Sequence, residues 1–155
     1  MCAFLSSREC TGQVFHPFAG KWYDAFLQSV QARCHAKETS LVYDMTYLTH
    51  SDSVTVNMTY TALTSDVREV RIVSGTASYG TANYSIFYRE KDKKKIATRI
   101  HISCPKNTYE DLFLSDAPMR IEIVSKEGDV WRFTYKDSKW TKEKKSVLEA
   151  IALVK

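Results

Sequence analysis

The sequence predicts an all-β domain, an eight-stranded antiparallel up-and-down β-barrel followed by one C-terminal α-helix. Three observations lead to this prediction. Apolar and polar residues alternate in short runs from residue 20 to about 136, which is the period of half-buried strands. Short turn-like segments separate successive runs, and the last segment changes to helical spacing. Closing about eight such strands into a barrel would remove the unpaired edges of the sheet.

The 155 residues fit a single domain, 1–155, with one core. An irregular N-terminal segment is expected over 1–17, the barrel over 18–136 and the helix over 141–154, with Thr141 as its N-cap. The composition, 44% hydrophobic and 26% charged, is typical of a globular chain and excludes a disordered one. Because no apolar run reaches about 18 residues, no membrane-spanning segment is expected.

The net charge of +4 comes largely from two lysine-rich patches, at 91–95 and 142–145. The first lies between two strand-like runs and is interpreted as a solvated hairpin turn. The second is interpreted as the wet face of the helix. A nucleic-acid interface would interleave basic and aromatic residues along one face, so nucleic acid is not expected as a partner.

The alternation also predicts the side chains that line the barrel. They are apolar or aromatic, several are tyrosines, and they share the inward parity of their strands. The expected lining is Tyr43, Met45, Tyr47, Val56, Met58, Tyr60, Ile72, Tyr84, Ile86, Tyr88, Ile100 and Ile102. Such a cavity suits a lipid or aromatic ligand held by a few hydrogen bonds. In the alternative, these side chains fill the barrel and leave no cavity.

Cysteines and glycosylation motifs point to a secreted protein. Cys2, Cys10, Cys34 and Cys104 form no metal-binding spacing, so two disulfides of open connectivity are expected. The sequons Asn57-Met58-Thr59 and Asn83-Tyr84-Ser85 are glycosylation acceptors. Both asparagines have the parity opposite to the inward residues, which places them on the wet face.

The stretch FAGKWYDAFLQSV, residues 18–30, carries a family resemblance. A Gly-x-Trp at the start of the first barrel strand, here Gly20 and Trp22, together with a late helix, resembles the lipocalin family. The pattern resembles divergent secreted members such as arthropod or parasite salivary lipocalins. The resemblance implies that the glycine allows a tight backbone turn and that the tryptophan plugs the closed end of the barrel.

The same resemblance implies roles for further residues. Asp24, Phe26 and Gln28 would line the cavity above the tryptophan. Residues 107–116 occupy the place of a family turn between the sixth and seventh strands. The basic residue that packs over the tryptophan late in the barrel would be Arg132 or Lys126, and the two imply different strand counts.

Intracellular fatty-acid binders also open with Gly-x-Trp and are the rival resemblance. They insert two short helices after the first strand, for which residues 28–38 are too short. The cysteines and sequons also favour secretion over this alternative.

Other chemistries have weaker support. His16, His35, His50 and His101 are scattered, and a haem-ligating histidine would have to turn into the barrel mouth. Asp24 inside the barrel would attract an amine unless a base such as Arg132 pairs with it. Cys104 could be a pocket nucleophile, but a disulfide is the expected state. No catalytic motif, metal site or cofactor is expected.

Two functions follow from these expectations. The first is a secreted carrier or scavenger that holds a fatty acid, an eicosanoid or a similar ligand in its barrel. The second is a protein-interaction module on the same scaffold, which inhibits a host protease, complement or coagulation factor through its loops. An enzyme is not expected.

Overall fold

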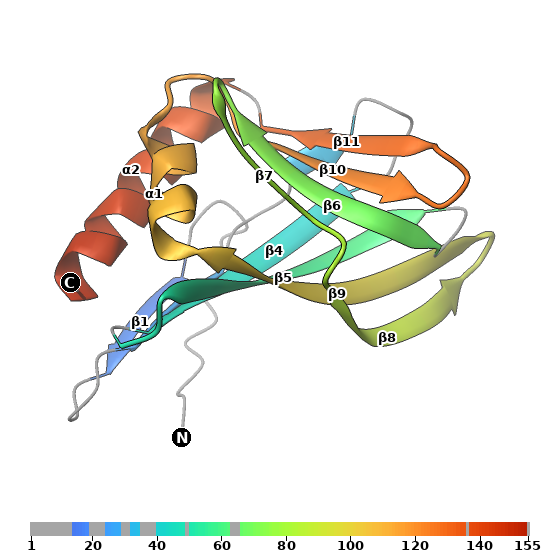
Figure 1. Ribbon diagram of the computed structural model, residues 1–155, viewed down its shortest axis with the longest axis horizontal. Helices are drawn as coiled ribbons and strands as arrows, with labels where there is room; N and C mark the ends of the chain where they lie inside the picture. Colours follow the sequence, from blue (N-terminus) through green and yellow to red (C-terminus); the bar gives the residue numbers. More distant parts are fainter. Residues whose placement is uncertain are drawn as a thin grey trace.

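The computed structural model describes residues 14–18, 24–28, 32–34, 40–48, 50–62, 66–135 and 137–154, with side chains described within 41–152. This part of the chain is mostly β, with eleven strands and two helices (Figure 1). The strands are β1 (Val14–Phe18), β2 (Asp24–Gln28), β3 (Ala32–Cys34), β4 (Ser40–Leu48), β5 (Ser53–Ala62), β6 (Val67–Ser74), β7 (Ala77–Thr81), β8 (Ser85–Asp92), β9 (Lys95–Pro105), β10 (Arg120–Ser125) and β11 (Val130–Thr134). The helices are α1 (Lys106–Leu114) and α2 (Asp137–Val154).

The strands form one bent antiparallel sheet in the order β7-β6-β10-β11-β3-β4-β5-β9-β8, and β2 and β1 branch from β4. Figure 1 shows β6, β10 and β11 lying across from β4, β5 and β9, with both helices at one end. The apolar faces of the two halves enclose a single core. The bend of the sheet therefore defines an interior, as the alternation predicts.

The predicted up-and-down order is wrong. β5 pairs with β9 rather than with β6, and β10 pairs with β6. β9 and β8 therefore follow β5 at one end of the sheet, and β6 and β7 follow β10 at the other end. Alternation identifies a strand and its buried face but does not encode which strand lies beside it, so the sequence pattern could not give this order.

The predicted closed barrel is not found among the described strands either. β7 and β8 end the path of the sheet and do not pair with each other. β7 continues from β6 through a turn at Gly75, where φ is +60° and an added Cβ would lie 2.5 Å from the Ser115 Oγ. Glycine is favoured there because this left-handed backbone conformation strains other residues, and an added Cβ would also displace the Ser115 hydroxyl.

The alternation itself is confirmed most clearly in β5. Its apolar positions are all buried, and the intervening polar positions are all half-buried. The same pattern appears in β9, where every second residue from Thr98 to Cys104 is buried. Period-2 patterning therefore located the core face of these central strands correctly.

Two expectations about helices need correction. Residues 107–116, expected to form a turn, belong largely to α1, which buries Tyr109, Leu112 and Phe113 at helical spacing. α2 begins at Asp137, one turn earlier than expected. Thr141 lies inside the helix, where its Oγ1 donates to the Asp137 carbonyl oxygen over 3.4 Å, so it is not the N-cap.

The extra turn of α2 brings Trp140 into the core. Its ring stacks on Phe113 of α1, with 5.4 Å between the ring centroids. The expected irregular N-terminal segment is also corrected in part, since β1 is a strand paired with β2. Neither α1 nor α2 is both long enough and apolar enough to cross a membrane.

Candidate functional site

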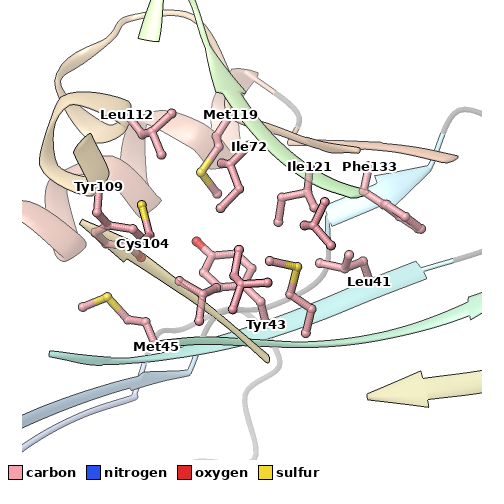
Figure 2. Packing of buried hydrophobic residues seen from close by; sticks show 14 of the residues in the cluster. Leu41, Tyr43, Met45, Ile72, Cys104, Tyr109, Leu112, Met119, Ile121 and Phe133 are labelled. Atoms are coloured by element: carbon pink, nitrogen blue, oxygen red, sulfur yellow. The ribbon is translucent and has the colours of Figure 1, made fainter. Parts of the chain in front are cut away.

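The interior contains most of the predicted lining residues. They come from β4, β5, β6 and β9, and Figure 2 shows side chains from the two halves of the sheet pointing toward one another. The predicted residues found in this buried cluster are Tyr43, Met45, Tyr47, Val56, Met58, Tyr60, Ile72, Ile100 and Ile102. The interior is therefore apolar, with phenol groups as its main polar atoms.

Two of these tyrosines are engaged at the helical end of the core. The Tyr43 hydroxyl donates to Glu143 of α2 over 3.2 Å, and the Tyr47 hydroxyl donates to Glu110 of α1 over 3.0 Å. Burial, reinforced by the Glu110 carboxylate, raises the pKa of Tyr47 to about 12. Tyr135 also donates to Glu143, over 3.0 Å. These hydroxyls hold the helices to the sheet.

Tyr60 is different, because its buried hydroxyl has no hydrogen-bond partner among the described residues. The same holds for the hydroxyl of Thr98, its direct cross-strand neighbour on β9. Their exposed fractions are 1% and 0%. Leaving a buried polar group unpaired costs about 1–3 kcal/mol. The two hydroxyls lie close enough to interact with each other, but this leaves hydrogen-bonding capacity on an apolar wall that a ligand group could satisfy.

The electrostatics of this site have two sources. Burial raises the pKa of Tyr60 to about 12, while the adjacent Thr98 hydroxyl and the positive charge of Arg89 act in the opposite direction. Arg89 of β8 pairs in register with Thr98, so both side chains leave the sheet on the same face. A cationic group therefore stands near the two hydroxyls.

β8 forms an open edge beside this site, and two predictions fail there. Ile86 pairs with the buried Ile100 and shares its face, but 38% of it is exposed. Tyr88 pairs with Arg99 on the opposite face and is 39% exposed. A β-bulge at Phe87 shifts the register after Ile86 and turns Tyr88 to the opposite face. Ile86 keeps the inward face and is exposed because β8 is an end strand of the sheet. The sequence predicts that both residues line the interior, but neither is buried.

Tyr84, the remaining predicted lining residue of this region, is partly buried against the core. Its hydroxyl donates to the Val67 carbonyl oxygen over 2.6 Å. This bond connects the chain just before β8 to the first residue of β6. Tyr84 therefore spans the side of the molecule where the two ends of the sheet remain unpaired.

A second set of unpartnered donors lies under the helices. The Tyr109 hydroxyl and the Trp140 Nε1 are buried without a hydrogen-bond partner among the described residues. Burial, with the nearby Tyr43 hydroxyl and Glu143 carboxylate, raises the pKa of Tyr109 well above its usual value. The sequence reading missed both residues, although the helical spacing of α1 could have identified Tyr109.

Cys104 carries a free thiol at the helical end of β9. Burial raises the pKa of this thiol to about 12, which suppresses the nucleophilic thiolate. The disulfide expected at Cys104 is therefore not present. Cys2 and Cys10 lie outside the described residues, as does the side chain of Cys34, so their predicted pairing stays a prediction.

The outer face of β4, β5 and β9 carries a polar network. Asp44 accepts from the Asn57 amide and from the Arg99 guanidinium, each over 2.7 Å. Arg99 also donates to Thr59 over 2.9 Å. Asn57, which is predicted to carry a glycan on the wet face, is half-buried rather than fully exposed. Its amide nitrogen donates to Asp44. Asn83 instead lies exposed between β7 and β8.

The residues that carried the family resemblance lie mostly outside the described part. This applies to Gly20 and Trp22, whereas the backbone of β2 includes Asp24, Phe26 and Gln28. The register pairs these three with Leu48, Thr46 and Asp44. Those β4 positions alternate with the core-facing tyrosines, so the pairing does not support the predicted lining role.

The two candidates for the late basic residue are both exposed. Arg132 lies next to the buried Phe133 in β11 and forms an ion pair with Glu122 over 3.2 Å. Lys126 lies in the turn between β10 and β11. His101 shares the outer face with Asn57, its register partner, as predicted. Within the described ranges, no group of three His, Cys, Asp or Glu side chains could hold a metal ion.

Comparisons with known proteins add no assignment. Scans of protein-family models, characterised proteins and solved structures found no match to this chain.

Proposed function

We propose that the protein binds a small amphipathic ligand, a fatty acid or a similar lipid, within the interior of its bent sheet. The observation that carries the proposal is the pair of unpartnered, buried hydroxyls on Tyr60 and Thr98. A ligand head group with acceptor oxygens would satisfy both donors. The aliphatic tail would then lie among side chains such as Met45 and Met58.

The charge near the hydroxyls favours an anionic head group. Arg89 shares the face of Thr98 and its charge acts on Tyr60. Carboxylate oxygens accept from hydroxyls and are attracted by a guanidinium. An amine ligand is a candidate only as a partner for an interior Asp24. At this end of the interior, an amine would meet the like charge of Arg89. Fatty acids and eicosanoids therefore fit this end of the interior better than amines.

The proposal can be tested with the delipidated full chain. Titration calorimetry with oleate and arachidonate is expected to show saturable binding, and serotonin is expected to bind at least tenfold more weakly. The double variant Tyr60→Phe with Thr98→Val removes both hydroxyls and is expected to weaken oleate binding about tenfold, because a hydrogen bond contributes about 0.5–1.5 kcal/mol.

A matched control separates this effect from the loss of any tyrosine hydroxyl. Tyr88→Phe makes the same change on the outer face and is expected to leave oleate binding unchanged. Absence of lipid binding in calorimetry, together with a ligand-free mass in native mass spectrometry, would reject the proposal.

The family resemblance and secretion remain hypotheses beside this proposal. A secreted carrier of the lipocalin type fits the sequons and the C-terminal helix, whereas the pairing of β5 with β9 and of β6 with β10 departs from the sequential order of that family. The alternative, an inhibitor acting through its loops, is favoured by exposed apolar side chains such as Leu114 at the end of α1. A ligand-free interior would favour this alternative.

A further inference from the structure

The hairpin formed by β8 and β9 concentrates the positive charge of the chain. Residues 89–95 contain five basic and two acidic residues, an excess of three, whereas the whole chain has an excess of four. Lys91, Lys93 and Lys94 are exposed. Within the described residues, no ion pair engages these three ammonium groups. Lys93 adopts a left-handed conformation, with φ at 56°, which forms the tip of the turn.

Apolar side chains precede this charge on the same strand. The residues Ile86, Phe87 and Tyr88 precede the lysines on β8. Their exposed fractions are 38%, 55% and 39%, respectively. They account for three of the four large hydrophobic residues found exposed in the described part of the chain. Ile86 shares the face of Ile100, and Tyr88 shares the face of Arg99, so apolar groups emerge on both faces of β8.

The hairpin also projects away from the helices. Figure 1 shows the tip of β8 and β9 at the end of the molecule opposite α1 and α2. The turn between β10 and β11 lies on the same side in Figure 1 and carries Lys126, Glu127 and Asp129, all exposed. At this end of the molecule, the β8–β9 hairpin is therefore basic and apolar, and the β10–β11 turn is slightly acidic.

We propose that the β8–β9 hairpin docks the protein onto an anionic lipid bilayer. Lysines at the tip would lie against anionic head groups, and Phe87 with its neighbours would enter the boundary between head groups and acyl chains. Basic residues near an anionic membrane are attracted by its surface potential, and aromatic side chains prefer this boundary. The aliphatic Ile86, which cannot stack on a base as an aromatic ring does, favours a bilayer over a nucleic acid.

Vesicle co-sedimentation of the full chain tests this inference. Vesicles of phosphatidylcholine with 30% phosphatidylglycerol are expected to bind the protein at low salt, and vesicles of phosphatidylcholine alone are expected to bind it much more weakly. Binding is expected to fall when the salt concentration rises, because surface charges are screened. The inference does not depend on a ligand in the core, so the Tyr60→Phe/Thr98→Val variant is expected to bind vesicles normally.

Two variants locate the surface. Each lysine near an anionic membrane contributes about fivefold to partitioning, so Lys91→Gln with Lys94→Gln is expected to weaken binding about 25-fold. Phe87→Ser is expected to weaken it about tenfold. The matched control makes the same charge change on α2, with Lys139→Gln and Lys142→Gln, both exposed. This control is expected to change binding less than twofold.

Several outcomes would overturn the inference. They are no binding to the anionic vesicles at low salt, or an equal loss of binding in the α2 control. Binding of a single-stranded oligonucleotide that requires Lys91 and Lys94, without vesicle binding, would assign the hairpin to nucleic acid instead. Self-association that Phe87→Ser abolishes, again without vesicle binding, would assign the β8 edge to a second copy of the chain.

Discussion

Replacing Tyr60 by phenylalanine is expected to stabilise the ligand-free protein, against the usual direction of a core substitution. The change removes only the hydroxyl, which is buried and has no hydrogen-bond partner among the described residues. The ring and its contact with Phe133, at 6.4 Å between centroids, are retained. The folded state therefore loses a desolvation cost and keeps its packing.

The expected gain follows from that cost. An unpaired buried polar group costs about 1–3 kcal/mol, so the free energy of unfolding should rise by about 1–2 kcal/mol after some relaxation of the site. For a chain of this size, 1 kcal/mol corresponds to about 2–4 °C in Tm. Thermal unfolding of the delipidated protein, followed by circular dichroism, should therefore show Tm higher by about 2–8 °C.

A control with the opposite sign makes this prediction specific. Tyr84→Phe removes a hydroxyl that donates to the Val67 carbonyl oxygen over 2.6 Å, and it should lower the free energy of unfolding by about 1 kcal/mol. If Tyr60→Phe leaves Tm unchanged or lowers it, the Tyr60 hydroxyl has a partner in the folded, ligand-free protein. The reasoning for an unsatisfied polar site would then be refuted.

Three further predictions concern groups outside this site. Arg99→Met removes the cationic partner of Asp44, whose side chain is 9% exposed. In urea unfolding, the free energy of unfolding should fall by about 2–3 kcal/mol, and a variant as stable as the wild type would contradict this. Burial raises the pKa of the Cys104 thiol to about 12. The stability that the buried, protonated thiol contributes is therefore complete below about pH 9, and it declines as the pH rises toward 12, because the thiol ionises more readily in the unfolded chain. Mass spectrometry should accordingly find Cys104 unmodified by iodoacetamide at pH 8.5 in the folded protein and alkylated in urea, and rapid labelling of the folded state would count against burial. In a secretory expression host, peptide mapping should find a glycan on the exposed Asn83 and none on Asn57, whose amide nitrogen is engaged; a glycan on Asn57 would show that this amide is accessible.

The sequence predicted the interior well where strands are central and regular. Val56, Met58 and Tyr60 were placed inside by parity, and all three are buried. Parity works in β5 because a neighbour on each side keeps the strand regular and one face is fully covered. The same rule failed in β8, because the bulge at Phe87 shifts the parity of the residues that follow.

Other features required information that alternation does not contain. Pairing of β5 with β9 joins segments about 40 residues apart, and nothing in either apolar pattern specifies the other as its neighbour. α1 was missed because its nine residues present only Tyr109, Leu112 and Phe113 as a short apolar face. Thr98 escaped notice as a polar site because it stands among isoleucines, and only the burial of its hydroxyl reveals its cost.

The bulge at Phe87 has a consequence for how such a protein could change its selectivity. Regular pairing through this point would set Tyr88 opposite Thr98, and the bulge sets Arg89 there instead. One backbone irregularity thus exchanges a neutral ring for a cation beside the interior hydroxyls. Changes in chain length near residue 87 could therefore alter the preferred charge of a bound molecule while every side chain of the interior wall stays the same.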